Sequence, residues 1–442
     1  MTTSETTAPP GAPSKDHAEF LGNAKWVALG ILFVVYVFNF IDRQIFAILQ
    51  ESIKRDLGLS DTELGLLGGF TFALFYTTFG VPIARLADRS NRSLIIAVCL
   101  AVWSFMTILC GRAVNFWTLA LARIGVGIGE AGCSPSAHSI ISDYFPPKER
   151  AGALAIYSVG INVGVMFGFF AGGFIDQYFG WRHAFLAVGL PGLLFALVVK
   201  FFLKEPPRGL AEGRVDEIKA SAPPKMVEAF KTLWKRRSFR HISVASGLHA
   251  FVAYGNQFLP PFFQRVHGFE TGELSLWLGL MSGIVGGLGV LAGGWLSDRY
   301  GAKDRRWLTW IPAVAILAAL PFAMAGLLVP SGYMALALLT IPAFLNPIYT
   351  GPTWAMTQGL VGPRMRAVAV AVLFFILNMV GLGFGPVAVG MLSDAFAAHG
   401  FGTSSIRWAL LATGLINIWA AVHYILAART LREEMAAAER GE

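Results

Sequence analysis

The sequence predicts an all-α membrane protein in which twelve transmembrane helices form two pseudo-symmetric six-helix bundles. Three features predict this fold class: long uncharged apolar runs, basic residues in alternate loops, and motifs that recur in the second half of the chain. Of the 442 residues, 55% are hydrophobic and 14% are charged, whereas a soluble domain has about 25% charged residues. The runs fit the roughly 20 residues of a membrane-spanning helix better than the roughly 10 residues of a membrane strand.

The expected helices follow one another through short polar loops. Their approximate ranges are 25–50, 62–84, 93–112, 116–144, 151–178, 182–203, 240–265, 272–298, 307–328, 332–358, 366–394 and 405–430. The first run is too long for the core of a signal peptide, so we expect it to be the first span. The expected domains are a disordered N-terminal segment (1–24), a first bundle (25–203), a linker (204–239), a second bundle (240–430) and a tail (431–442).

Positive charge gathers in every second loop. These basic residues are Arg85, Arg89, Arg92, Lys148, Arg150, Lys235, Arg236, Arg237, Arg299, Lys303, Arg305, Arg306, Arg364 and Arg366. With twelve spans, all of these loops lie on one side of the membrane, and loops rich in Lys and Arg stay in the cytoplasm. We therefore expect both termini to be cytoplasmic.

Three pairs of positions recur at a nearly constant distance along the chain. The pairs are Asp88 with Asp298, Arg150 with Arg366, and Asp176 with Asp394, separated by 210, 216 and 218 residues. The first pair lies in ARLADRSNR and GWLSDRYGAKDRR, which follow the second and the eighth expected helix. Such a repeat indicates two halves related by an axis along the membrane normal, as in rocker-type transporters.

Several function classes find no support in the sequence. It has no phosphate-binding loop of the form G-x-x-x-x-G-K-[ST], so direct drive by ATP is not expected. No metal-ligand spacing and no catalytic triad stand out, so we expect no enzyme, no metal and no cofactor. The net charge of +8 lies in the loops, where topology explains it, and we expect no nucleic-acid partner.

Four ionisable residues fall deepest inside the expected spans. Asp42 and Arg43 stand side by side in the first helix, in FNFIDRQIF. Arg123 and Glu130 lie seven residues apart in the fourth helix and so share a face. A rise of about 1.5 Å per residue puts Asp42 near Arg123 and Glu130 nearer the midplane. Because helix tilt alters such depths, we treat the four residues as one cluster.

Charged groups inside a span are costly and mark functional sites by default. We expect Asp42 or Glu130 to take up a proton. Protonation would free Arg43 or Arg123 to hold an anionic headgroup in its bidentate fork, so that proton and substrate compete for one charge balance. The alternative is a set of static salt bridges that hold the two helices together.

Other polar positions in the spans are candidates for substrate contact. They are Tyr36, Asn39, Asn162, His249, Tyr254, Asn256, Gln257, Asn346, Thr350, Trp354 and Asn378. Alternatively, each of these side chains forms an ordinary hydrogen bond between helices.

Several of these motifs resemble the major facilitator superfamily. ARLADRSNR at 84–92 resembles its loop signature Gly-x-Leu-Ala-Asp-Arg-x-Gly-Arg, although Ala84 and Asn91 stand where the signature has Gly. RIGVGIG at 123–129 resembles its fourth-helix motif. Within the superfamily, the combination of NFIDR at 39–43, GEA at 129–131 and GLGFGP at 381–386 resembles the spinster family, whose eukaryotic members are associated with the export of lysophospholipids and sphingosine-1-phosphate.

The resemblance implies further roles. Asp88, Arg89 and Arg92, with Asp298 as a weaker counterpart, are expected to form a conformational latch between the halves. A monomer is expected, and the short linker suggests a bacterial member in the inner membrane.

Together these expectations describe a secondary active transporter that moves an amphipathic, lipid-like anion by alternating access, coupled to protons. Its partners would be the substrate, protons and membrane lipids. The alternatives are a symporter of small organic anions and, in another class, a membrane sensor or scaffold that transports nothing.

Overall fold

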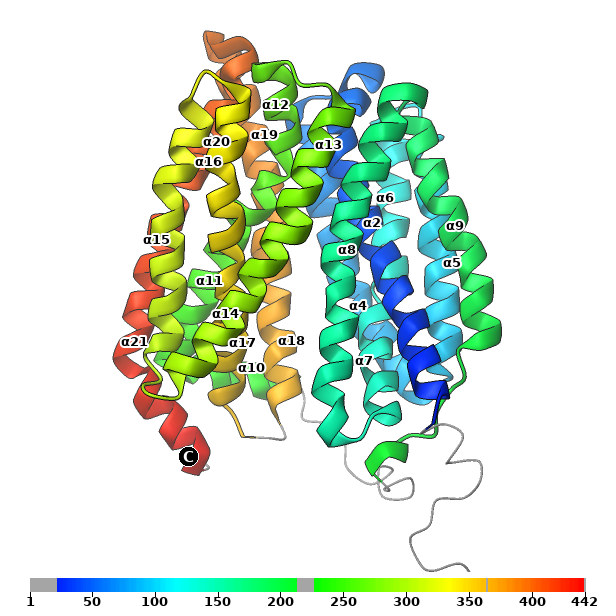
Figure 1. Ribbon diagram of the computed structural model, residues 1–442, viewed down its shortest axis with the longest axis vertical. Helices are drawn as coiled ribbons and strands as arrows, with labels where there is room; N and C mark the ends of the chain where they lie inside the picture. The colour runs from blue at the N-terminus through cyan, green and yellow to red at the C-terminus, as the bar shows by residue number, and fades with distance from the viewer. Residues whose placement is uncertain (1–21, 213–225, 363–364, 441–442) are drawn as a thin grey trace, which may run out of the picture.

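The computed structural model describes residues 22–212, 226–362 and 365–440, in which all regular structure is helical (Figure 1). The segment expected to be disordered therefore lies, up to residue 21, outside the described residues, as does Arg364. The helices run side by side along the vertical axis of Figure 1. Both described ends of the chain lie at the lower end of that view, which we call the terminal end; the opposite end is the distal end.

The first half contains six helical passages. They are α2 (Ala24–Leu57); α3 (Asp61–Gly65), η1 (Leu66–Phe70) and α4 (Thr71–Arg89); α5 (Arg92–Cys110); α6 (Phe116–Glu130) and α7 (Cys133–Tyr144); α8 (Pro147–Phe179); and α9 (Trp181–Phe202). The linker then carries η2 (Leu210–Glu212) and α10 (Met226–Lys235).

The second half repeats this pattern. Its passages are α11 (Arg237–Gly255), η4 (Asn256–Phe258) and α12 (Leu259–His267); α13 (Thr271–Leu280), η5 (Met281–Val285) and α14 (Gly286–Gly301); α15 (Trp307–Leu328); α16 (Gly332–Leu345), η6 (Asn346–Tyr349) and α17 (Thr350–Gly359); α18 (Arg366–Ile376), η8 (Leu377–Phe384) and α19 (Gly385–Phe396); and α20 (Ser405–Gly414) and α21 (Ile416–Arg440). The short helices η9 (Ala397–Phe401) and η10 (Gly402–Ser404) join the last two passages.

The twelve expected helices are confirmed as passages. Nine stretches of the described chain are long and apolar enough to cross a membrane by length and composition alone. The number is smaller because α6–α7 and α11–α12 are interrupted, and because one stretch, Val368–Arg440, contains the last two passages. The expected tail is a continuation of α21, whose Glu434 accepts hydrogen bonds from the backbone N–H groups of Arg237 and Ser238 at 2.7 and 3.0 Å.

Glycines on α8 bring this helix close to α2, which carries part of the charged cluster. A Cβ atom on Gly164 would lie 2.5 Å from the carbonyl oxygen of Val37, and one on Gly168 would lie 3.0 Å from that of Ile41. Only glycine allows such a close approach of two backbones. The small residues of α8 thereby fix the position of α2.

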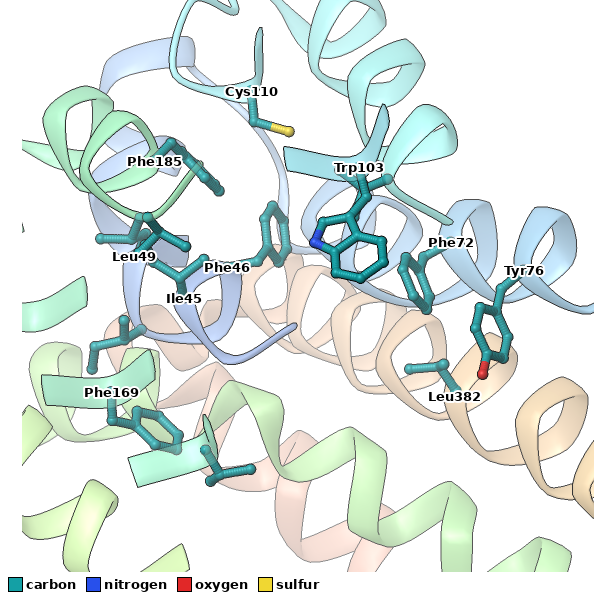
Figure 2. Close-up of a cluster of buried hydrophobic side chains, with 14 of the residues drawn as sticks. Ile45, Phe46, Leu49, Phe72, Tyr76, Trp103, Cys110, Phe169, Phe185 and Leu382 are labelled. Carbon is teal, nitrogen blue, oxygen red and sulfur yellow. The ribbon is translucent and has the colours of Figure 1, made fainter. Parts of the chain in front are cut away.

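A buried aromatic layer lies beside the cluster (Figure 2). Phe46 of α2, Phe72 of α4 and Trp103 of α5 follow one another there, and each is at most 1% exposed. Leu382 of η8 faces this layer from the second half, near Tyr76 (Figure 2). The layer thus joins the two halves in the middle of the molecule.

The halves also meet at the distal end, in two contacts. In the first, Asp394 at the end of α19 accepts hydrogen bonds from the N–H groups of Asp61 and Thr62, at 3.1 and 2.8 Å, and from Thr62 Oγ1 at 2.6 Å. In the second, Gln177 of α8 accepts a hydrogen bond from the N–H of Gly272 at 2.8 Å. Each contact joins the end of one half's fifth helix to the start of the other half's second helix.

A charge network strengthens the first contact. Arg265 of α12 donates to both carboxylate oxygens of Asp61, at 2.7 and 2.8 Å, and to Glu51 at 2.6 Å. Lys54 Nζ also lies 2.5 Å from Asp61, and Ser393 donates to it at 2.6 Å. These groups close the distal end between the two halves.

Candidate functional site

The predicted charge cluster contains one close ion pair. Arg43 Nε on α2 donates to Glu130 Oε2 on α6 at 2.8 Å. The Glu130 side chain is 0% exposed and that of Arg43 is 16% exposed. The second carboxylate oxygen of Glu130 has no hydrogen-bond partner among the described residues. Arg43 therefore contacts a fully buried acid on one side, while part of its own side chain remains accessible on the other.

Aromatic rings surround both guanidinium groups. The Arg43 guanidinium lies 5.1 Å from the ring centre of Phe72 and 4.8 Å from that of Tyr76. Arg123 lies 4.8 Å from the ring of Phe46 and 5.2 Å from that of Phe72. Phe72 is shared by the two, and cation–π contacts of this kind stabilise a desolvated cation by up to about 2 kcal/mol.

The estimated depth placed Arg123 near Asp42, and the two interact through their charges without forming an ion pair. It is 3% exposed, and its Nε donates to the backbone carbonyl of Leu67 at 3.3 Å. Leu67 lies in η1, where the helix widens and leaves carbonyl groups free for other donors. Asp42 and Arg123 act on each other through their charges, but no N–O distance within 4.0 Å joins Arg123 to any acid that the structure describes.

Asp42 is the most isolated member of the cluster. It is 2% exposed, and its Oδ1 has no hydrogen-bond partner in the described part of the chain. Trp103 and Thr107 of α5 are its polar neighbours. A buried charge without a partner is very costly, so this carboxyl group is under pressure to become neutral.

A cavity of about 360 Å³ adjoins the cluster and extends between the two halves. Its first-half wall includes Arg43, Gln44 and Arg123. Its apolar wall is lined by Phe169, Leu278, Met281, Leu320, Ala323, Met324, Leu327, Leu339, Ala343 and Leu410. The cavity thus carries positive charge from the first half and is lined for the rest mostly by apolar side chains, with neutral polar groups among them.

The candidate contact residues divide into two groups. Those that line the cavity are Tyr254, Asn256, Gln257 and Asn346. Five others have partners elsewhere. Tyr36 stacks on Tyr157 with ring centres 4.1 Å apart, Asn39 lies beside Glu130, and Asn162 packs against Gly287. Trp354 and Phe374 have ring centres 6.2 Å apart, and Asn378 donates to the carbonyl of Phe374 at 2.7 Å. His249 lies behind the cavity wall, bonded to Asn417.

The expected latch residues are not brought together across the halves. Arg92 is buried within the first half, where its Nε donates to Glu205 at 2.6 Å and its guanidinium pairs with Asp143. Arg89 and Asp298 are exposed, and the side chain of Asp88 lies outside the described part of the structure. The hydrogen bonds and ion pairs described above between the halves are at the distal end instead.

The sequence held a signal for part of that distal contact. Ser60 accepts from the N–H of Glu63 at 3.1 Å, and Glu63 accepts from the N–H of Ser60 at 2.8 Å, which is a capping box. The pattern SDTE at 60–63 therefore marks a helix start with an acid, Asp61, in its first turn. The sequence does not show that Asp61 pairs with Arg265, which follows only from the arrangement in space.

Comparison with known proteins agrees with the fold. The family model described as Major Facilitator Superfamily matches residues 32–386. An "MFS-type efflux pump" of Mycolicibacterium smegmatis is 33% identical over 435 residues, covering 97% of this chain and 99% of the relative. A "Sphingosine-1-phosphate transporter" of Danio rerio is 28% identical over 416 residues, covering 88% of this chain and 79% of the relative.

A solved structure is similar over nearly the whole chain. It is that of a bacterial homologue of the human lysosomal transporter Spinster, described as inward-facing and unoccupied. The match has 34% sequence identity and a TM-score of 0.85, and it covers 96% of this chain and 99% of the other. The chain therefore belongs to the major facilitator superfamily, as an integral multi-pass membrane transporter that resembles the spinster family.

Proposed function

We propose that this protein is a proton-coupled secondary transporter of an amphipathic, lipid-like anion. The observation that carries the proposal is the lining of the cavity, which combines two arginines of the first half with a large set of apolar side chains. A lysophospholipid or a sphingosine-phosphate likewise combines an anionic headgroup with a hydrocarbon tail. A small organic anion has no need of the apolar lining.

Arg43 is the residue best suited to hold the headgroup. Its guanidinium borders the cavity and offers further N–H donors beyond the Nε that is bonded to Glu130. Its planar fork fits a phosphate or carboxylate group in a bidentate manner. Arg123, bonded to a backbone carbonyl and without an acid partner, supplies a second positive charge to the cavity.

Proton coupling follows from the ion pair between Arg43 and Glu130. A proton on Glu130 removes the negative charge that holds Arg43, so that Arg43 can turn fully to the anion. Release of the anion lets the pair form again, and the proton then leaves. Asp42, buried close by without an ion pair, is the second candidate to carry a proton in the cycle.

In a cycle of alternating access, the distal network closes one side of the membrane. The positive-inside rule puts the terminal end in the cytoplasm of what we take to be a bacterial inner membrane. The contacts of Asp61, Arg265 and Asp394 then seal the outer side while the cavity is available from the inner side. In the opposite conformation, Asp88, Arg89, Arg92 and Asp298 would form the latch at the terminal end.

The relatives support the two parts of the proposal. The sphingosine-1-phosphate transporter supports a phosphate-bearing amphiphile as the substrate class. The bacterial efflux pump supports a transporter in a bacterial membrane.

The test is transport by purified protein in liposomes. Uptake of lysophosphatidylglycerol and of a hexuronate is measured with and without a pH gradient, for the wild type and for Glu130→Gln and Asp42→Asn. Gradient-dependent uptake of the lipid, lost in Glu130→Gln, is expected. Uptake of the hexuronate alone would favour a symporter of small organic anions, and no uptake of either would favour a sensor or scaffold.

A further inference from the structure

A buried histidine stands behind the cavity wall in the second half. His249 of α11 is 1% exposed. Its Nδ1 lies 2.9 Å from Asn417 Oδ1 on α21, and its Nε2 lies 3.2 Å from the backbone carbonyl oxygen of Asn346 in η6. The ring of Tyr349 packs edge-on against it, with ring centres 4.5 Å apart. The imidazole is thus held at both nitrogens by polar groups of two other helices.

The two contacts restrict where the protons of His249 lie. A backbone carbonyl only accepts, so Nε2 must carry a hydrogen. A neutral imidazole has a single N–H, which leaves Nδ1 as an acceptor that needs the amide nitrogen of Asn417. An imidazolium has two N–H groups, and Nδ1 then donates to Asn417 Oδ1, the orientation seen here. The direction of the Asn417 amide is therefore tied to the charge on His249.

Asn417 and Asn346 both line the cavity. When His249 is neutral, Asn417 turns its nitrogen to the ring and its oxygen away from it. When His249 is charged, the same amide turns its N–H donors away from the ring instead. Asn346 Oδ1 is buried without a hydrogen-bond partner in the described chain, so this wall still has hydrogen-bonding capacity for a ligand.

The surroundings leave His249 free of competing charges. No charged side chain of the described chain acts on it, and the largest influence is burial, which disfavours the imidazolium, so the charged form depends on the oxygen atoms of Asn417 and Asn346 that face the ring. The titratable groups that face it from the neighbouring helices are Tyr349 of η6 and, one step further, Tyr254 and Tyr424. The other two histidines on α11 and α21, His241 and His423, contact each other through their Nδ1 atoms at 3.0 Å.

We propose that His249 is a further proton-binding residue of the carrier, placed in its second half, and that through Asn417 it sets which hydrogen-bonding group the second half offers to the substrate. When His249 is protonated, Asn417 presents an N–H donor that suits an ester, hydroxyl or phosphate oxygen of an anionic amphiphile. This deepens the proposed function and rests on it for the substrate. By linkage, such a substrate binds more tightly when His249 is protonated.

The protonation itself is tested without any substrate. Protein labelled with ¹⁵N-histidine is titrated in detergent from about pH 5 to about pH 8, across the usual histidine pKa of about 6.5. The signal of His249 is identified by its loss in His249→Gln. We expect a change from the neutral form protonated at Nε2 to the imidazolium. A ring that keeps one form throughout this range would overturn the proposal.

The coupling to substrate is tested by binding of lysophosphatidylglycerol at the two ends of this range. The wild type is expected to bind on the order of fivefold more tightly at low pH through this residue. This change of affinity with pH is expected to be lost in His249→Gln and in Asn417→Ala, and to be kept in the matched control His241→Gln. If it persists in His249→Gln, the link between His249 and the substrate is wrong. If the wild type neither binds nor transports the lipid, the proposed function fails, and the titration alone decides on His249.

Discussion

The two halves of the molecule repeat each other in fold but not in chemistry. The first half places four ionisable side chains in or beside the cavity wall, with Arg43 paired to a fully buried Glu130. The second half faces the same cavity with apolar side chains and neutral amides, and the imidazole of His249 lies behind this wall. The repeat therefore fixes the scaffold, while the site arises where the halves have diverged.

The distal contacts show the same divergence at equivalent positions. Asp394 crosses to the other half and accepts from the start of α3. Its counterpart Asp176, 218 residues earlier, accepts from Ser52 of its own half at 2.7 Å and interacts across the halves with Thr271. Gln177 crosses as well, since it accepts from the N–H of Gly272 at 2.8 Å and donates to the Glu270 carboxylate at 2.6 Å. The first contact contains the ion pairs of Asp61 with Arg265 and Lys54, whereas the second contains no ion pair among the described residues.

The largest effect is expected from breaking the charged wall. Arg43→Ala leaves Glu130 buried without its partner, which costs about 3–5 kcal/mol when the acid stays charged. It also removes the bidentate donor for the anion, worth about 3 kcal/mol, or roughly a hundredfold in binding. We expect gradient-driven lipid uptake in liposomes to fall at least that far, and Arg43→Lys to recover part of it.

Arg182→Ala is the matched control for this change. Arg182 pairs with Asp56 at the distal surface, where the two side chains are 41% and 45% exposed. An exposed pair contributes up to about 1 kcal/mol, so uptake should stay near the wild-type rate. Equal activity of Arg43→Ala and Arg182→Ala would mean that the cluster is only a structural support.

A second effect separates the distal contact that contains ion pairs from the one that does not. Asp394→Asn keeps an acceptor but removes the negative charge from the start of α3, where a helix favours an acid by up to about 1 kcal/mol. We expect the population open at the distal end to rise about fivefold. Gln177→Ala removes the two hydrogen bonds of an exposed side chain, to Gly272 and to Glu270, and should change that population less, by about twofold.

Electron-resonance distances between spin labels measure this difference. Val114→Cys and His399→Cys put labels on exposed distal positions of the two halves, and the native cysteines Cys99, Cys110 and Cys133 are buried. A larger opening in Gln177→Ala than in Asp394→Asn would show that the charge does not hold the distal end closed.

Much of the fold followed from the sequence because its signals are local. Apolar length predicts a span, and a charge within one stands out, so the passages and the members of the cluster were predictable. The pairing of Arg43 with Glu130 was not, since a depth estimated along straight helices ignores their tilt. Phe72, shared by both guanidinium groups, gave no signal because it is one of 35 phenylalanines in an apolar chain.

A third effect tests the apolar wall. Ala323→Phe on α15 places a large side chain in the cavity, where each methylene of tail that is displaced loses about 0.8 kcal/mol. Loss of about two methylenes would weaken binding of long-chain lysophosphatidylglycerol about tenfold and shift the preference to shorter chains. Leu317→Phe, on the outward, 41% exposed face of the same helix, is the control. An unchanged chain-length preference in Ala323→Phe would mean that the tail lies elsewhere.

The smallest effect distinguishes two asparagines that look equivalent in the sequence. Helical spacing shows which residues share a face, but not which face meets the cavity. Asn256 lines the cavity, whereas Asn162 packs against Gly287 at the contact between α8 and α14. Asn256→Ala should weaken lipid binding by about 1 kcal/mol, or about fivefold, as expected for a lost hydrogen bond. Asn162→Ala should leave binding within about twofold, and a larger loss there than in Asn256→Ala would place the substrate against the first half alone.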